Sequence, residues 1–155
     1  MEAEDPGGWL IVLAEVEALR WVLAERRMAF SEGQCRRASA IRPGDELVVY
    51  MGRGAFHNPT RDRSQLAALA RVTSDIRALS PPVSIAGREF ACGCTLEILM
   101  SLPERSGVPV QPLVGRLSFV RWKEVWGQYF RAGLVRVAPN DMQVLRTALG
   151  QAAVG

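Results

Sequence analysis

Apolar residues in the first part of the chain follow two spacings, one typical of strands and one typical of helices. Residues 9–14 form an unbroken run of aromatic, β-branched and aliphatic side chains entered through Pro6-Gly7-Gly8, which predicts a buried strand. Residues 15–27 place apolar side chains at helical spacing with charged residues opposite them. Ser31 is suited to cap a short helix that ends at Ser39. The chain therefore opens as strand, helix and short helix.

A second apolar strand and a long polar loop follow. The sequence Arg-Pro-Gly-Asp at residues 42–45 predicts a turn, and residues 46–51 predict the next strand. We expect this strand to lie beside residues 9–14, because these two apolar runs are the best candidates for neighbouring strands of one sheet. Residues 52–64 are polar, contain glycine and lack periodicity, so they predict a loop. Loops of this length tend to be functional or disordered.

The second half of the chain predicts mostly strands. The expected elements are a strand at 65–73, a break at Ser80-Pro81-Pro82, a strand at 83–86, a turn at Gly87-Arg88, and one bent strand over 89–102 with a bulge at Gly93. A loop at 103–112, a short helix and strand at 113–120, one helical turn at 122–126 and a helix over 139–149 complete the chain. This order predicts the α+β class with a curled, largely antiparallel sheet.

The composition is that of an ordinary globular domain. The 155 residues are 48% hydrophobic and 23% charged, which excludes a disordered, collagen-like or coiled-coil chain. No apolar run approaches the roughly 18 residues of a membrane span, and the first strand follows acidic residues where a signal peptide would be basic. Three cysteines disfavour a secreted disulfide framework. We expect a soluble, cytoplasmic protein with no membrane partner that forms one domain over residues 1–155.

Charge is unevenly distributed along the chain, although the net charge is only +3. Residues 1–25 carry one basic and six acidic side chains, whereas residues 26–63 carry eight arginines and four acidic side chains. A segment rich in arginine is suited to phosphate, because the guanidinium group presents a planar set of donors. A general preference for arginine is the alternative explanation, since the chain has 18 arginines and one lysine.

The loop over residues 52–63 concentrates groups that suit a nucleic acid. Arg53, Arg61 and Arg63 are candidates to bind phosphates, and Asn58 offers the donor and acceptor of an amide to the edge of a base. Phe56 and His57 offer rings on which a base could stack. The alternative is that Asn58-Pro59 is only a turn and that Asp62 pairs with a neighbouring arginine.

Aromatic residues are the second candidate feature. Trp9 and Tyr50 lie on the two clearest strands, and Trp122 and Trp126 are four residues apart, which predicts that they share one helix face. Several aromatic rings around a cavity would hold a flat or methylated group. The alternative for each ring is a place in the hydrophobic core.

Several kinds of catalytic and metal site are absent from the sequence. His57 is the only histidine, which excludes zinc sites that need two, and Cys92-Gly93-Cys94 is too closely spaced for a CxxC motif. The sequence has no phosphate-binding GxxxxGK[ST] motif and no GxSxG motif. We interpret Cys35, Cys92 and Cys94 as small hydrophobic residues, with a pair of Cys35 or Cys92 and His57 as the catalytic alternative.

The motifs resemble the EVE-domain family of the PUA-like superfamily, in order and spacing, over residues 8–149. The similar segments are Gly8-Trp9-Leu10-Ile11, Arg42-Pro43-Gly44-Asp45-Glu46-Leu47-Val48-Val49-Tyr50, Val72-Thr73-Ser74-Asp75, Pro112-Leu113-Val114, Leu117-Ser118-Phe119-Val120, Trp126-Gly127 and Val137-Ala138-Pro139-Asn140-Asp141. The Trp-Gly that usually follows the first helix of the family is Phe30-Ser31 here.

The resemblance implies a curled, PUA-like β-barrel of five or six mostly antiparallel strands with flanking helices, related to YTH and ASCH domains. It also implies an aromatic-lined pocket for a modified base of DNA or RNA. Trp9, Phe30, Tyr50 and Trp126 are the aromatic candidates for this pocket, together with Phe56, His57 and Asn58 of the loop.

The sequence therefore predicts a binding module for nucleic acid that carries a modified or flipped base. We expect no catalytic residue, metal site or cofactor. The alternatives are a small hydrolase or base-modifying enzyme in the same pocket, with His57, Asp62 or Glu46 as acid or base, and a sensor of a small free ligand. The sequence does not indicate the oligomeric state.

Overall fold

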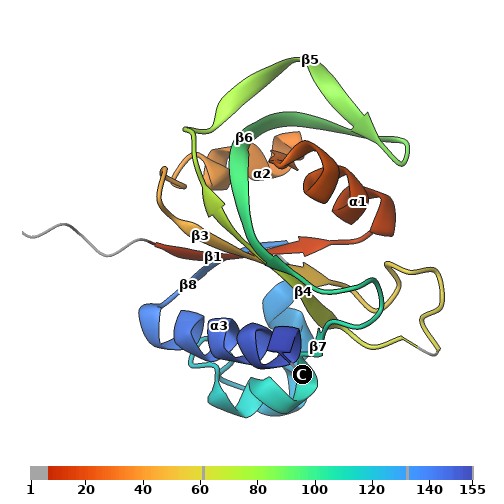
Figure 1. The fold of residues 1–155 in the computed structure, drawn as a ribbon, viewed down its shortest axis with the longest axis vertical. Coiled ribbons are helices and arrows are strands. Elements are labelled where there is room, and N and C mark those ends of the chain that lie inside the picture. The colour runs from red at the N-terminus through yellow and green to blue at the C-terminus, as the bar shows by residue number, and fades with distance from the viewer. Residues whose placement is uncertain (1–6, 61, 132, 155) are drawn as a thin grey trace, which may run out of the picture.

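One strongly bent, mixed sheet organises the molecule. The computed structural model describes residues 7–60, 62–131 and 133–154. Eight strands form the order β2-β6-β4-β3-β1-β8, with β5 paired to β6 and β7 paired to β4 (Figure 1). The elements are β1 (Gly8–Leu13), α1 (Val16–Glu25), β2 (Arg27–Phe30), α2 (Glu32–Ala38), β3 (Glu46–Met51), β4 (Gln65–Val72), β5 (Arg77–Ile85), β6 (Arg88–Ser101), β7 (Val108–Pro109), the 3-10 helices η1 (Gln111–Arg116) and η2 (Lys123–Phe130), β8 (Leu134–Val137) and α3 (Pro139–Val154).

The α+β class and the curled sheet predicted from the sequence are confirmed. Most neighbouring strands are antiparallel, but β1 and β3 are parallel, with residue pairs from Gly8 and Glu46 to Leu13 and Met51. The prediction that these two strands are neighbours in one sheet is therefore confirmed as well. The sheet has eight strands rather than five or six, because short segments such as β2 and β7 also pair with long strands.

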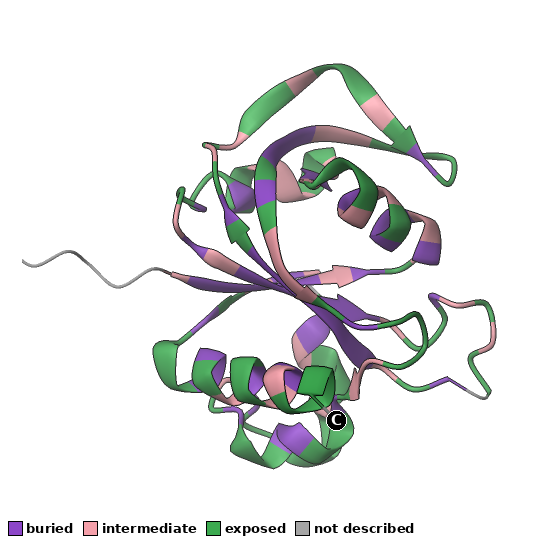
Figure 2. Ribbon diagram, viewed as in Figure 1, coloured by how far each residue is buried: buried purple, intermediate pink, exposed green. Residues whose placement is uncertain are grey.

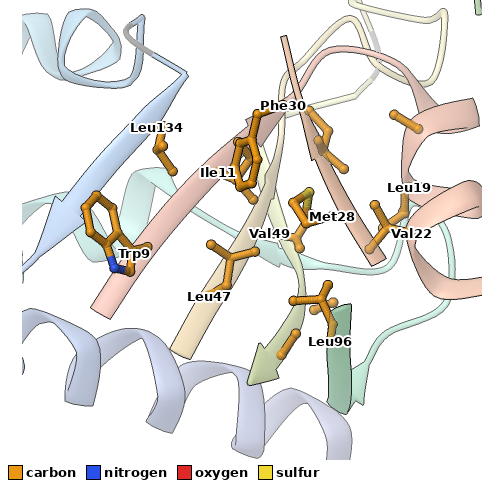
Figure 3. Packing of buried hydrophobic residues seen from close by; sticks show 14 of the residues in the cluster. Trp9, Ile11, Leu19, Val22, Met28, Phe30, Leu47, Val49, Leu96 and Leu134 are labelled. Atoms are coloured by element: carbon orange, nitrogen blue, oxygen red, sulfur yellow. The ribbon is translucent and has the colours of Figure 1, made fainter. Parts of the chain in front are cut away.

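Both faces of the central strands are buried, which explains their unbroken apolar runs. Trp9 and Ile11 of β1 belong to a first core beneath α1 and α2, as do Leu47 and Val49 of β3 (Figure 3). The intervening residue Leu10 belongs to a second core on the other face, against α3, η1 and η2. The central strands are accordingly buried along most of their length, whereas β5 at the margin is largely exposed (Figure 2).

Two details of the second half differ from the prediction. The strand β5 continues through Pro81 and Pro82, because its pairing with β6 is interrupted between Ala78 and Val83 and the prolines need no ladder hydrogen bond there. Gly93 is not a bulge, since it pairs in register with Ala29 of β2 and with Arg77 of β5. A side chain at Gly93 would overlap the carbonyl oxygen of Met28, so the glycine permits the close approach of β2.

The segment before α3 is built from 3-10 turns. The prediction that Trp122 and Trp126 share one helix face is wrong, because η2 is a 3-10 helix with a kink at Val125. Trp122 is 65% exposed, whereas Trp126 packs against the second core. The short strand expected within residues 113–120 is replaced by η1 and turns, and α3 extends to Val154. None of the helices in the described ranges is long and apolar enough to cross a membrane.

The cysteines are not simply small hydrophobic residues. Cys35 of α2 and Cys92 of β6 form a disulfide across 57 residues of sequence. This pairing corrects the sequence interpretation, which had no means of placing α2 against β6. It also excludes a thiol nucleophile at either position while the bond is intact. Cys94 remains a free, buried thiol, and burial raises its pKa to about 11.

Candidate functional site

A pocket of about 630 Å³ opens at the carboxyl end of β3 and brings together four of the predicted site residues. Tyr50 comes from β3, Arg53 and Arg63 come from the loop over residues 52–64, and Trp126 comes from η2. The remaining lining residues are Ser64, Pro109, Gln111, Pro112 and Gly127. We call this cavity the Tyr50 pocket. Its walls combine aromatic and proline surfaces with two cationic side chains.

The aromatic rings of the Tyr50 pocket do not form a complete cage. Tyr50 stacks on Phe130 with ring centroids 4.6 Å apart and planes 15° apart, and it is only 5% exposed. Burial raises the pKa of its phenol, while a hydrogen bond with Ser64 lowers it in part. Trp126 contacts Phe130 edge to face at 6.0 Å and is half-buried. Tyr50 therefore supplies part of the floor, and Trp126 is the aromatic wall open to a ligand.

The cationic side of the Tyr50 pocket is unneutralised in the part of the chain that the structure describes. Arg53 and Arg63 are both exposed, and neither forms an ion pair with a described acidic residue. Asp62 pairs with Arg105 instead, at 2.9 Å, and is almost fully buried. The alternative in which Asp62 pairs with an adjacent arginine is therefore wrong for Arg63, and this arginine stays open to an anion. Arg61 lies outside the described residues.

The other candidates in the same loop point elsewhere. Phe56 packs against the first core, and His57 lies beside Glu15 and Glu17 at the start of α1. The side-chain oxygen of Asn58 accepts a hydrogen bond from Thr60, which is the local turn considered as the alternative. None of the three lines the Tyr50 pocket.

Trp9 and Phe30 belong to the first core rather than to the Tyr50 pocket. Phe30 is fully buried. Trp9 is nearly so, and its indole N–H donates to the buried carboxylate of Asp45 at 3.0 Å. The guanidinium of Arg136 lies 5.5 Å from the centre of the Trp9 ring, at the edge of a separate open depression.

A smaller cavity, which sequence reasoning missed, lies between the end of β1, the start of α1 and the hairpin of β5 and β6. Its volume is about 70 Å³, room for a few water molecules. Ser31, Gln34 and Arg88 supply polar groups, and Phe90 supplies an apolar wall. The sequence signal for this cavity is Ser31 itself, which stands where the resembling family has the glycine of Trp-Gly. We call it the Ser31 cavity.

The residues considered for catalysis are dispersed. His57 contacts Glu15 and Glu17, Asp62 is held by Arg105, and Glu46 pairs with Arg146 of α3. Glu46 begins β3, at the opposite end of that strand from the Tyr50 pocket. In the described ranges, none of these pockets is therefore lined by more than one of the three groups.

Comparison with known protein sequences places the chain near proteins named UPF0310. No family model matches it. A UPF0310 protein of Mesorhizobium japonicum is 24% identical over 143 residues, which cover 90% of each chain. A UPF0310 protein of Mycobacterium avium is 37% identical over 41 residues, which span 26% of this chain and only 30% of that relative. The stronger identity is thus confined to a short segment.

Comparison with solved structures establishes the fold. The YTH domain-containing protein mmi1, in a complex with RNA, matches with a TM-score of 0.65 and 10% identity over 96% of this chain and 84% of that one. A hypothetical protein from Leishmania major matches with a TM-score of 0.61 and 15% identity, over 97% and 99% of the two chains. A protein from Pseudomonas putida matches with a TM-score of 0.60 and 16% identity, over 91% and 98%. The chain therefore has an α+β fold like that of the YTH domain.

Proposed function

We propose that this protein is a nucleic-acid-binding module that holds one unstacked base in the Tyr50 pocket. The observation that carries the proposal is the convergence of Tyr50, Arg53, Arg63 and Trp126 on one cavity from separate segments of the chain. An aromatic wall and two unneutralised arginines are the chemistry that a base and its flanking phosphates require.

The dimensions of the pocket agree with this role. Pockets for small ligands usually measure roughly 300–1,000 Å³, and the Tyr50 pocket falls within that range. Stacking of a base on one aromatic ring contributes about 1–3 kcal/mol. Trp126 is the ring available for this stacking, whereas the floor around Tyr50 limits how deeply the base enters.

The comparisons support a nucleic acid as the partner. The mmi1 YTH domain, whose fold this chain shares, is in a complex with RNA. The proposal includes membership of the EVE-domain family, supported by the order of the sequence motifs. It also includes a preference for a modified base, since Pro109, Pro112 and Trp126 offer apolar surface to an added methyl group.

The test compares two tryptophans of the same segment. Binding of fluorescent single-stranded DNA and RNA oligonucleotides, with and without one methylated base, is measured for the wild type, Trp126→Ala and Trp122→Ala. Loss of stacking on Trp126 should weaken binding by about 5- to 150-fold and remove the preference for the methylated base. Trp122 is exposed but does not line the pocket, so its variant should bind like the wild type.

The same oligonucleotides, tested also on the variant Gln34→Ala, distinguish the alternatives. If Trp126→Ala retains full affinity and Gln34→Ala loses it, binding depends on the surface around Gln34 and the proposed pocket is wrong. Absence of oligonucleotide binding by the wild type would contradict the proposed function and favour a sensor of a small free ligand. Tyr50→Ala is not a suitable probe, because it removes a ring packed in the second core.

A further inference from the structure

A second cavity adjoins the Tyr50 pocket. Its volume is about 230 Å³, and it lies between the end of the loop over residues 52–64 and the segment that leads into β7. Arg63, Ser64 and Pro109 line both cavities. We call the second one the Arg105 cavity, after the arginine on its far side. A ligand that fills one cavity therefore reaches the wall of the other.

Two buried polar side chains form part of the wall of the Arg105 cavity. Asp62 is 7% exposed, and its carboxylate accepts hydrogen bonds from Nε and Nη2 of Arg105 at 2.9–3.1 Å. Gln65 is 6% exposed, and its amide oxygen accepts from the N–H of Gly107 at 2.7 Å. Its amide nitrogen donates to the carbonyl of Arg63 at 3.3 Å. These bonds fasten the loop to the segment before β7, so the polar groups are held in place before a ligand arrives.

Arg105 keeps hydrogen-bond donors available to a ligand. A guanidinium group has five N–H donors, and Asp62 occupies the edge formed by Nε and Nη2. No described residue accepts a hydrogen bond from Nη1 of Arg105. Arg63 and Arg105 also place two positive charges on the cavity against the single negative charge of Asp62. The cavity therefore suits a group with a negative charge and several acceptor oxygens.

We propose that the Arg105 cavity holds the phosphate that links the base in the Tyr50 pocket to the next nucleotide, with Nη1 of Arg105 as a donor. The assignment rests on the proposed function. No described aromatic residue lines this cavity, so a second base has no ring on which to stack. Its volume also lies below the roughly 300 Å³ at which pockets for small ligands usually begin, which suits a phosphate better than a whole nucleotide.

The competing account is an ion pair that only stabilises the loop. Asp62 and Arg105 are 43 residues apart in sequence, and their contact closes the segment between them. A purely structural ion pair predicts that substitution of Arg105 affects a charged and an uncharged ligand equally. A phosphate contact predicts that the effect depends on the charge of one phosphate.

The experiment pairs a change in the protein with a change in the ligand. Binding to the full chain is measured for a short oligonucleotide with one methylated base, and for two versions with an uncharged methylphosphonate on one or the other side of that base. One of the two replacements should weaken binding to the wild type by about tenfold or more, because a charge-assisted hydrogen bond is lost. Arg105→Lys keeps a positive charge beside Asp62 but lacks the second edge of the guanidinium. It should bind the unmodified backbone about tenfold more weakly and lose nothing further to that methylphosphonate.

Arg20→Lys is the matched control. Arg20 forms the same kind of two-point ion pair, with Glu104 at 2.6 and 3.0 Å, but it lines none of the pockets in the described ranges. Its variant should respond to each oligonucleotide like the wild type. If Arg105→Lys fails to fold, as circular dichroism would record, the double variant Asp62→Asn with Arg105→Gln replaces it, because it leaves no buried charge unpaired.

Two results would overturn the phosphate site. If the losses caused by Arg105→Lys and by the methylphosphonate multiply, the ion pair acts only on the fold. If neither methylphosphonate weakens binding to the wild type, no phosphate occupies the cavity. Both results leave the proposed function intact while binding depends on Trp126, whereas a wild type that binds no oligonucleotide contradicts the proposed function itself.

Discussion

A buried carboxylate illustrates how single residues stabilise this fold. The side chain of Asp45 accepts hydrogen bonds from the backbone N–H groups of Gly7 and Arg42 and from the indole of Trp9, at 2.9–3.0 Å. It therefore joins the turn before β3 to the beginning of β1. The Gly-Asp motif noted in the sequence is structural in this respect, and Trp9 is oriented by it.

We predict that Asp45→Ala lowers the free energy of unfolding by about 2–4 kcal/mol, because three donors lose their charged acceptor. Asp45→Asn should cost less, since an amide oxygen still accepts from one or two of these donors. Urea denaturation followed by tryptophan fluorescence measures both values. Equal stability of Asp45→Ala and the wild type would show that water replaces the carboxylate at no cost.

The second residue-scale prediction concerns pH. Burial raises the pKa of Cys94 to about 11 from about 9, so the folded state holds the thiol proton more tightly than the unfolded state. The corresponding stability is fully present below pH 9 and declines as the pH rises through 11. We therefore expect Cys94 to resist iodoacetamide at pH 8 in the folded protein and to react readily in urea, as mass spectrometry would record. Rapid labelling of the folded protein would contradict this.

At the scale of elements, the strands β2 and β6 approach each other closely. Met28 and Cys94 are partners in this pair, and Gly93 beside them leaves room for the carbonyl of Met28. The disulfide between Cys35 and Cys92 joins α2 to the same part of β6. Strand pairing, a close backbone approach at Gly93 and a disulfide therefore all connect β6 to the elements beside it, β2 and α2.

We predict that Gly93→Ala destabilises the protein by about 2 kcal/mol or more, because the added methyl group forces the two strands apart. Gly54→Ala is the control, since space around Gly54 is open and its substitution should change stability by less than about 1 kcal/mol. Thermal unfolding of both variants provides the comparison. Similar melting temperatures for the two would mean that β2 shifts freely.

At the scale of the whole molecule, the bent sheet separates two cores and leaves the Tyr50 pocket at the carboxyl end of β3. The loop after β3 supplies arginines to this pocket, while its His57 lies beside the start of α1. One segment thus reaches two places on the surface. Asp62, the acidic residue of this loop, forms an ion pair with Arg105. The positive charges of Arg53 and Arg63 therefore remain available to a ligand.

We predict that nucleic-acid affinity falls steeply with salt, because phosphate contacts release counterions. Replacing Arg53 or Arg63 with Ala should weaken binding across all sequences and reduce the slope of log affinity against log salt by about one. Arg77→Ala, on the exposed strand β5, is a control for overall charge. Unchanged slopes for both pocket variants would remove these arginines from the interface.

The sequence predicted the elements that repeat a simple pattern. Apolar runs located β1 and β3, helical spacing located α1 and α3, and turn residues located the hairpin between β5 and β6. It was less successful where pairing or packing overrides the local pattern. An edge strand tolerated Pro81 and Pro82, and 3-10 turns replaced the helix that would have aligned Trp122 with Trp126.

By itself, then, the sequence determined the fold class and the neighbouring central strands, and its candidates included four of the nine residues that line the Tyr50 pocket. The tertiary structure alone decided which aromatic rings remain accessible, because Trp9, Phe30 and Tyr50 have the same local patterns whether they face a core or a ligand. It also decided the partners of Asp62, Cys35 and His57, which lie far along the chain. Local periodicity reports whether a side chain is buried, but only the folded chain brings distant residues within reach of one another.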